Sequence, residues 1–296
     1  DLREREQVES MLTYPEPDPV LFSIGSLKIH WYGFMYLISL AGGWALARWR
    51  VRRHPALGWN SSELDDLLFY VALGVVLGAR LGYILFYDMQ NIAEDPLRIL
   101  RVWEGVMSFH GGLLGVMLAM WLYGRKHGRS FFNVADFIAP IVPLGLFAGR
   151  IANFINAELW GAPTELAVGM QVRCGLSANA QALCERVGTS ADGLMSVPVH
   201  ASQLYEAALE GVVLFLILWF YSAKPRPAMS VSGLFLLGYG IFRFAIEFVR
   251  MPDAHIGYLA GGWLTLGMVL TLPMMAGGIL LLVLAANRRN RHATVS

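Results

Sequence analysis

Apolar and polar positions alternate along this chain in long blocks. Seven blocks are apolar over about 20 residues, the length at which a helix crosses the hydrocarbon core of a bilayer. They are residues 31–47, 67–87, 105–123, 137–157, 204–221, 231–249 and 263–285. The pattern predicts an all-α, polytopic integral membrane protein with seven transmembrane helices. We expect residues 11–296 to form a single membrane domain, and residues 1–10, which are mostly polar, to be a disordered tag or extension.

Basic residues mark every second connection between these blocks. They follow the first, third, fifth and seventh blocks, and they are Arg48, Arg50, Arg52, Arg53, Arg125, Lys126, Arg129, Lys224, Arg226, Arg288, Arg289 and Arg291. Cytoplasmic loops of membrane proteins carry such an excess of Lys and Arg. The distribution therefore predicts an N-terminus on the outer side of the membrane and a C-terminus in the cytoplasm.

Composition agrees with this prediction. Of the 296 residues, 56% are hydrophobic and only 15% are charged. These proportions are typical of a membrane protein and exclude an ordinary soluble globule. The formal net charge is +1, and we expect no nucleic-acid partner.

Two outer segments are long enough to have a structure of their own. Residues 88–104 mix polar with apolar positions and predict a periplasmic arm that lies along the membrane surface. Residues 161–200 form the longest polar stretch and predict a small periplasmic head. Both cysteines of the chain, Cys174 and Cys184, fall in this head. A disulfide between them would contribute about 3 kcal/mol in the chain-entropy model, and two free thiols are the alternative.

Ionisable side chains inside the apolar blocks gather in the predicted outer half of the membrane. With Tyr32 beside them, they are Arg80, His110, Arg150, Glu206, Glu210, Arg243 and Glu247. Scattered polar contacts would occupy both halves, so this convergence predicts one polar cavity that opens to the outer side. Three arginines suit an anionic phosphate, because a guanidinium presents a planar fork of donors. The alternative is a closed set of buried ion pairs that serves only packing.

The stretch 145–161 combines small and apolar residues with several polar ones. Arg150 lies in an apolar block, where an arginine is costly and is by default a functional group that faces the bundle interior. At helical spacing, Arg150, Asn153 and Ala157 share one face. The alternative is a helix that is held in place by polar contacts alone.

His110 is the candidate proton acceptor, since imidazole takes up protons near neutral pH. It precedes Gly111 and Gly112, which we expect to bring the backbone close to a bound ligand. The alternative is a buried histidine whose hydrogen bonds are satisfied within the core.

Other polar and small residues are interpreted as structural. Asp136 precedes the fourth apolar block and is expected to be an N-cap. We expect close helix packing at the glycine series Gly74, Gly78 and Gly82.

Several ordered motifs resemble those of the bacterial prolipoprotein diacylglyceryl transferases, and together they cover nearly the whole chain from Met11. Besides the stretch 145–161 they are Asp-Pro-Val at 18–20, His-Trp-Tyr-Gly at 30–33, Gly-Ala-Arg-Leu-Gly-Tyr at 78–83, Ser-Phe-His-Gly-Gly at 108–112, His-Ala-Ser-Gln-Leu-Tyr-Glu at 200–206, Tyr-Gly-Ile-Phe-Arg at 239–243 and Glu-Phe-Val-Arg-Met-Pro-Asp at 247–253. The chain departs from the family at Ala157 and Ala201, where glycine and proline are usual.

The resemblance implies an enzyme of the bacterial inner (cytoplasmic) membrane with its active site toward the periplasm. Such an enzyme moves the diacylglyceryl group of phosphatidylglycerol onto the thiol of the lipobox cysteine of a preprolipoprotein, and it releases glycerol phosphate. It needs no cofactor and no metal. The residues implied by the matching motifs are Tyr32, His110, Arg150, Asn153, Glu158, Gly161, Glu206, Arg243 and Glu247.

The residues and the resemblance combine into one chemical hypothesis. The substrate thiolate attacks a glycerol carbon, and a phosphate ester leaves. We expect Arg150 to bind the phosphate and Arg243 to stabilise the developing charge. His110 is either the thiol base or a phosphate orienter, and both roles stay open here. The remaining candidates for phosphatidylglycerol binding are Tyr32, Arg80, Asn153, Glu158, Gly161, Glu206 and Glu247.

Two other classes of protein would use the same arginines. A polytopic transporter for an anionic amphiphile predicts repeated halves and a site at the membrane midplane, whereas seven blocks do not halve and the charges lie off-centre. A lipid-binding scaffold explains the arginines but gives no reason for His110 beside them. We therefore favour the enzyme, and we expect it to be a monomer.

Overall fold

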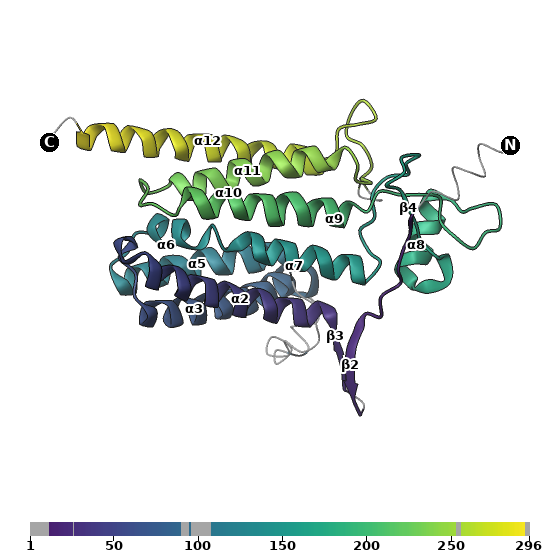
Figure 1. Ribbon diagram of the computed structural model, residues 1–296, viewed down its shortest axis with the longest axis horizontal. Helices are drawn as coiled ribbons and strands as arrows, with labels where there is room; N and C mark the ends of the chain where they lie inside the picture. The colour runs from purple at the N-terminus through teal and green to yellow at the C-terminus, as the bar shows by residue number, and fades with distance from the viewer. Residues whose placement is uncertain (1–11, 26, 90–94, 96–107, 253–255, 294–296) are drawn as a thin grey trace. The chain divides into compact units, whose positions relative to one another are not determined.

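The computed structural model describes residues 12–25, 27–89, 95, 108–252 and 256–293, and they are mostly helical (Figure 1). The predicted tag at 1–10 lies outside these ranges, as does the predicted arm at 88–104 except for residues 88, 89 and 95. The chain divides into two compact units. The first unit comprises Asp1–Gly43, Ala139–Ser222 and Ser230–Ser296, and the second comprises Trp44–Ile138 and Ala223–Met229.

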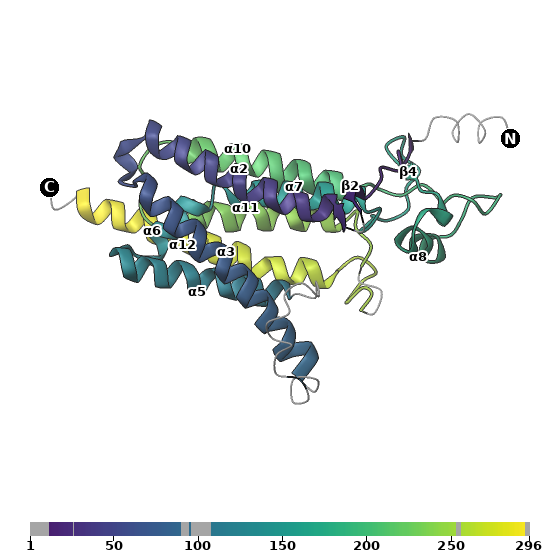
Figure 2. The same ribbon diagram turned by 90° about the horizontal axis from the view of Figure 1, so that it is seen from below.

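The second unit is built around two helices that lie side by side (Figure 2). They are α3 (Ser61–Tyr83), which continues as the π-helical turn η2 (Ile84–Asp88), and α5 (Phe109–His127). Asn60 begins α3 with a capping box, since its side chain accepts from the Glu63 N–H at 2.9 Å and its own N–H donates to the Glu63 carboxylate at 3.1 Å. The short helices η1 (Pro55–Leu57) and α6 (Phe131–Ile138) complete the unit, together with the end of α2 (Trp31–Arg53), which begins in the first unit.

Glycines bring α3 and α5 into backbone contact. A Cβ atom at Gly78 would lie 2.4 Å from the Gly111 carbonyl oxygen, and one at Gly111 would lie 2.3 Å from the Gly78 carbonyl oxygen. Close packing at the series Gly74, Gly78 and Gly82 is thus confirmed. Gly111 packs against α3 in the same way, since a Cβ atom there would also lie 2.7 Å from Gly82 Cα. The approach to a ligand that is expected of Gly111 and Gly112 stays a prediction.

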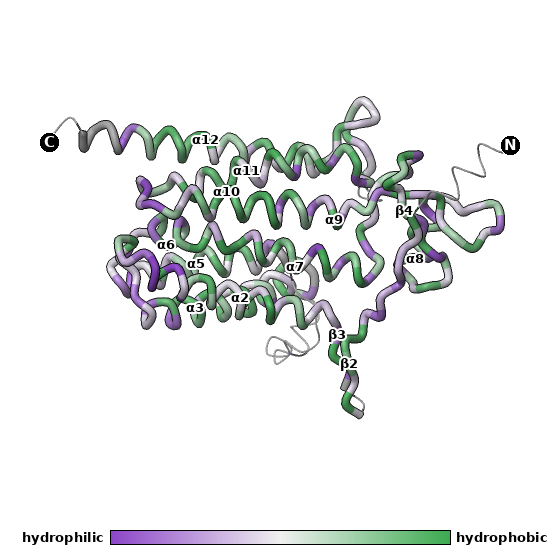
Figure 3. Tube along the Cα trace, in the orientation of Figure 1, coloured by the Kyte–Doolittle hydropathy of each residue, from purple (hydrophilic) through white to green (hydrophobic). Residues whose placement is uncertain are grey.

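The first unit carries the remaining long helices. They are α7 (Val142–Ile155), the continuous segment α9 (Ser202–Glu206), η6 (Ala207–Val213) and α10 (Leu214–Tyr221), then α11 (Ser230–Glu247) and α12 (Leu266–Ala293). α7 packs on α9 and η6, and α11 packs on both α10 and α12 (Figure 1). Segment η6 is π-helical, and α10 is mostly apolar along its length (Figure 3). Its Leu214 and Leu218 are fully buried with Ala139 and Val231.

Residues 161–200 fold as a small head within the first unit. The head contains β4 (Met170–Gln171), η5 (Cys174–Leu176) and α8 (Ala178–Val187). A disulfide joins Cys174 to Cys184. Strand β1 (Leu12–Thr13) pairs in parallel with β4, and Tyr14 after it enters the apolar core of the head at 2% exposure. The Tyr14 hydroxyl lies 2.7 Å from the Phe154 carbonyl and 3.0 Å from that of Ile155, so it ties this core to the last turn of α7.

The strands were not expected in an all-α fold. Besides the pair β1 and β4, strands β2 (Val20–Ile24) and β3 (Leu27–His30) form an antiparallel hairpin before α2. The β1–β4 pair joins positions almost 160 residues apart, such as Leu12 and Met170. Local hydrophobic periodicity carries no signal for such a pairing.

A helix, or a run of consecutive helices, occupies each of the seven predicted apolar blocks within the described residues. Four of these are long and apolar enough to cross a membrane: Ser61–Phe86, Ser202–Tyr221, Ser230–Glu247 and Leu266–Arg288. A fifth is added if α6 and α7 count as one broken span. The chain is therefore a multi-pass membrane protein by its helices, and the seven crossings and their orientation stay predictions.

The expected N-cap role of Asp136 is wrong. Helix α6 begins at Phe131, where the Ser130 hydroxyl accepts from the Asn133 N–H at 3.2 Å, so Asp136 lies inside the helix. Its carboxylate instead accepts from the Met229 N–H at 2.7 Å. The helix begins before the fourth apolar block because Ser130, and not Asp136, supplies the cap.

Candidate active site

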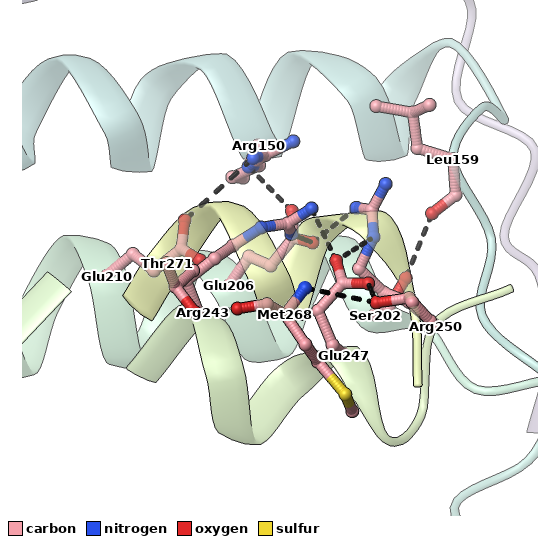
Figure 4. A network of polar contacts seen from close by, with 11 residues as sticks. Arg150, Leu159, Ser202, Glu206, Glu210, Arg243, Glu247, Arg250, Met268 and Thr271 are labelled. Carbon is pink, nitrogen blue, oxygen red and sulfur yellow. Dashed lines mark hydrogen bonds and ion pairs between the residues drawn. The ribbon is translucent and has the colours of Figure 1, made fainter. Parts of the chain in front are cut away.

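Three helices of the first unit and the segment that follows α11 bring a buried carboxylate and three arginines together (Figure 4). Glu206, at the end of α9, pairs through Oε2 with Arg150 Nε of α7 at 2.6 Å. Its Oε1 accepts from Arg243 Nη1 of α11 at 2.8 Å and from Arg250 Nη1 at 2.5 Å. One carboxylate therefore fixes guanidinium groups from segments about 100 residues apart in the chain, as the sequence positions 150, 206, 243 and 250 show.

Glu247 extends this network at the end of α11. Its Oε1 pairs with Arg243 Nη2 at 2.6 Å and with Arg250 Nε at 3.3 Å. Its Oε2 accepts from the Thr265 hydroxyl at 2.6 Å. The pairing of Arg243 with Glu247, four residues apart, matches the spacing of neighbours on one helix face.

Arg250 is a member of the network that the sequence reasoning did not single out. It stands three residues after Glu247 in a motif that had been recognised, and this i, i+3 spacing was the available signal. The residue lies past the last residue of α11, however, where helical spacing no longer predicts the direction of a side chain.

Burial differs systematically between the two charges of the network. The side chains of Glu206 and Glu247 are 0% and 5% exposed, whereas those of Arg150, Arg243 and Arg250 keep 19%, 16% and 14% of their surface exposed. Charges buried this deeply require partners, and the carboxylates have them. The carboxylates thus form the buried part of the network, and the arginine side chains keep its accessible surface. Guanidinium groups can bind anions by paired N–H donors.

The π-helical segment η6, which follows Glu206 directly, positions Glu210 against α7. Gly211 in this segment approaches so closely that a Cβ atom there would lie 2.7 Å from Phe147 Cβ. Arg150 follows Phe147 by one helical turn, and its Nη2 lies 3.8 Å from the fully buried Glu210 carboxylate. Such π-helical insertions occur frequently at functional sites.

The loop after α7 holds Asn153 and Glu158 together. Asn153 Nδ2 donates to Glu158 Oε1 at 2.7 Å, and Asn156 Nδ2 lies 3.5 Å from the same oxygen. Helix α7 ends at Ile155, and Ala157 has a φ of 53°. Ala157 therefore does not share the face of Arg150 and Asn153, and that expectation is wrong. A positive φ also gives the physical reason why glycine suits this position.

Buried polar side chains of α9 hold this loop in place. The Ser202 hydroxyl donates to the Leu159 carbonyl at 2.9 Å, and Gln203 Nε2 donates to the Glu158 carbonyl at 2.5 Å. Gly161 then passes between two backbone segments, since its N–H donates to the His200 carbonyl at 2.8 Å and a Cβ atom would lie 2.4 Å from the Val249 carbonyl oxygen. Gly161 is thus required by close packing beside the Arg250 end of the network.

Tyr32 stands in the first turn of α2, with its hydroxyl 3.4 Å from that of Tyr36. It lies within electrostatic range of Arg150 and Glu158. The sequence-predicted residues Tyr32, Asn153 and Glu158 are thus associated with the Arg150 side of the network.

Arg80 and His110 belong to the second unit and are described with that unit alone. Arg80 is buried at 2% exposure near the end of α3. His110 is an exposed residue in the first turn of α5, which is capped by the Ser108 hydroxyl accepting from the Gly111 N–H at 3.3 Å. In the part of the chain that the structure describes, no group of three or more His, Cys, Asp or Glu side chains could hold a metal ion.

Comparison with known proteins gives a consistent result over nearly the whole chain. The family model described as prolipoprotein diacylglyceryl transferase matches residues 19–284. The chain is 55% identical over 279 residues to the phosphatidylglycerol–prolipoprotein diacylglyceryl transferase of Ectopseudomonas mendocina (strain ymp), covering 94% of this chain and 98% of the relative. It is 54% identical over 283 residues to the protein of that name from Azotobacter vinelandii, covering 96% and 100%. The protein of that name from Methylococcus capsulatus is 54% identical over 280 residues, covering 95% and 100%.

Proposed function

This chain belongs to the prolipoprotein diacylglyceryl transferase family, and on that premise we propose that it transfers the diacylglyceryl group of phosphatidylglycerol to the lipobox cysteine of preprolipoproteins. In this reaction a carbon–sulfur bond forms at the terminal glycerol carbon of the diacylglyceryl group. The bond between that carbon and the phosphate oxygen breaks, and glycerol phosphate leaves. The thiol proton must pass to a base or to the departing phosphate, so that charge and atoms balance.

The observation that carries this proposal is the burial asymmetry of the ion network. Three arginines are held by buried carboxylates and keep part of their side-chain surface exposed, an arrangement that suits a phosphodiester. Groups held in advance at the place where charge develops stabilise a transition state without having to reorganise. Arg150 binds the phosphate in this account, and Arg243 stabilises the charge of the leaving group.

The supporting residues take positioning roles. Glu206 and Glu247 orient the arginines, and Asn153, Glu158 and Gly161 shape the loop beside Arg150. Arg80 and Tyr32 complete the set of phosphatidylglycerol-binding residues. His110 accepts the thiol proton or orients the phosphate, and the pH dependence of an His110→Asn variant separates the two roles. A base predicts a changed pH profile, whereas an orienter predicts a raised KM for the lipid.

The proposed setting is the bacterial inner membrane. Seven crossings would place the N-terminus outside and the C-terminus in the cytoplasm, because basic residues follow every second apolar block. The network and the head would then face the periplasm, where the substrate cysteine arrives and where a disulfide persists. The chain would act as a monomer, as a single membrane domain.

A transfer assay tests the proposed function. Purified protein in detergent is mixed with phosphatidylglycerol and a short peptide that carries a lipobox cysteine. We expect glycerol phosphate release together with a gain of the diacylglyceryl mass on the peptide, and neither with a peptide in which serine replaces the cysteine. Arg150→Ala and Arg243→Ala should each lose this activity while remaining folded. Full activity in both variants would contradict the phosphate-binding and charge-stabilising roles assigned to these two arginines.

A further inference from the structure

We propose that one end of the second unit binds the headgroups of anionic phospholipids through two arginines that stack on exposed tryptophans. The pairs are Arg53 with Trp49 and Arg125 with Trp121, and together they are called the Trp–Arg surface here. The surface belongs to the second unit and shares no residue with the ion network of the first. Its partner is the lipid of the surrounding membrane and not the donor of the reaction, so this inference does not depend on the proposed function.

The Trp–Arg surface lies where a candidate membrane span begins. The end of α2, the start of α3 and the end of α5 lie at one end of the second unit (Figures 1 and 2). Helix α3 starts the candidate span Ser61–Phe86, and two carboxylates near its start hold the other helices. Asp65 accepts from Trp44 Nε1 of α2 at 2.8 Å, and Asp66 accepts from Lys126 of α5 at 3.2 Å. The ends of α2 and α5 are therefore fixed at the level at which α3 enters the membrane.

An exposed apolar face of α5 leads directly to Arg125. Leu114, Leu118 and Trp121 are exposed and follow one another at intervals of four and three residues. Arg125 comes four residues later and is exposed as well, so it continues the same helix face. On a membrane-spanning helix such a face contacts lipid chains, and tryptophan is enriched where the chains meet the headgroups. The arginine one turn beyond this tryptophan therefore reaches the level of the lipid phosphates.

Each arginine of the surface lies over the ring of the tryptophan four residues before it. Arg125 Cζ is 5.3 Å from the centroid of the Trp121 ring, and Arg53 Cζ is 5.8 Å from that of Trp49. These distances are within the range of cation–π attraction. Stacking uses the flat face of a guanidinium, whereas its N–H donors point outward in the plane of the group. The donors therefore stay available to phosphate oxygens while the indole holds the group in place.

The acidic side chains near the start of α3 are paired with other basic residues. Three ion pairs of 2.8 to 3.3 Å involve them, and they are Asp65 with Arg48, Asp66 with Lys126 and Glu63 with Arg129. In the part of the chain that the structure describes, no carboxylate forms an ion pair with Arg53 or Arg125. The surface thus offers positive charge that attracts an anionic headgroup. A choline headgroup brings its own cation beside the phosphate and gains less.

Native mass spectrometry of the delipidated protein in a neutral detergent tests the proposal, because it resolves each bound lipid as a separate mass. The probes are phosphatidylserine, which is anionic, and phosphatidylcholine, which is zwitterionic. Each basic residue near an anionic surface contributes about fivefold to binding. Arg125→Gln should therefore weaken the binding of phosphatidylserine about fivefold. The double variant Arg53→Gln with Arg125→Gln should lower the overall binding constant about 30-fold, and phosphatidylcholine binding should change little.

A charge-matched double variant is the control. Arg52→Gln with Lys224→Gln removes the same charge from exposed positions of the same unit, and neither side chain stacks on a ring among the described residues. This variant should bind phosphatidylserine within about twofold of wild type, since exposed charges away from the bound headgroup are screened. The ion network is intact in both double variants, so any lipid that it binds is retained equally.

Three outcomes would overturn the proposal. Unchanged phosphatidylserine binding in the double variant Arg53→Gln with Arg125→Gln would show that these arginines do not contact the headgroup. An equal loss in the charge-matched control would show that binding depends on diffuse positive charge and not on the Trp–Arg surface. Glycerophosphoserine, the headgroup without acyl chains, should bind far more weakly than the lipid, and equal affinity would show that the partner is a free phosphate compound and not a membrane lipid.

Discussion

Replacing Glu206 by glutamine should damage both stability and activity, because one carboxylate fixes three arginines. Glutamine keeps the size of the side chain and removes its charge. In the folded protein Glu206 is completely buried and contacts Arg150, Arg243 and Arg250 at 2.5 to 2.8 Å. After the substitution, the ion pairs that remain for these arginines among the described residues are those with Glu210 and Glu247.

The expected magnitude follows from the burial of the pair. Removing one partner of a buried ion pair costs about 3–5 kcal/mol, since the other charge is left uncompensated. The arginines keep 14% to 19% of their side-chain surface exposed, so water compensates part of the loss. We therefore expect the lower end, about 3 kcal/mol, which corresponds to a decrease in Tm of roughly 6–12 °C for a chain of this size. A misplaced arginine also costs about 100-fold in rate.

Thermal unfolding in detergent measures the first effect, and the transfer assay at a temperature well below Tm measures the second. Glu16→Gln is the matched control, because Glu16 makes an ion pair of 2.5 Å with Arg173 in an exposed setting. Exposed pairs contribute little, so this variant should behave like the wild-type protein. A Glu206→Gln variant with a Tm within about 2 °C of wild type and a normal rate would refute the supporting role assigned to the carboxylate.

Three further predictions concern the rest of the molecule. The double variant Cys174→Ser with Cys184→Ser should keep its turnover but lose about 3 kcal/mol of stability, measured by thermal unfolding, and an unchanged Tm would contradict this. Gly111→Ala should destabilise the protein by about 1–3 kcal/mol through backbone overlap, whereas Gly112→Ala, whose Cβ would make an ordinary contact at 3.5 Å, should not. Burial lowers the pKa of His200, so its neutral form is favoured in the folded protein and stability should decrease as the pH falls below about 6.5. His200→Gln should weaken this pH dependence in unfolding experiments, and an unchanged slope would contradict the assignment.

The helices and the gathering of charged residues could be predicted from the sequence because both depend on local chemistry. An apolar block of bilayer length has few alternatives to a helix. A charged side chain inside such a block has a high free energy unless it is paired with an opposite charge. The association of Arg150, Glu206, Arg243 and Glu247 could therefore be predicted.

The loop, cap and strand details depend on contacts that the local sequence does not specify. Ala157 adopts a positive φ because the loop is held by Ser202 and Gln203, two side chains about 45 positions away. Strand β1 forms because its partner in the head lies beside it. Arg250 joins the network only after the chain has left α11. In each case tertiary contacts decide the conformation, and no periodic pattern records them.

The most direct test of the central claim is the fate of the oxygen that joins the diacylglyceryl group to phosphorus. Phosphatidylglycerol labelled with ¹⁸O in this bridging position is incubated with the wild-type protein and the cysteine peptide. The ¹⁸O content of glycerol phosphate and of the modified peptide is then measured by mass spectrometry. If the arginines stabilise a departing phosphate, all the label will be in glycerol phosphate and none on the lipid-modified peptide. Label retained on the peptide, or release of glycerol phosphate without modified peptide, would contradict the account.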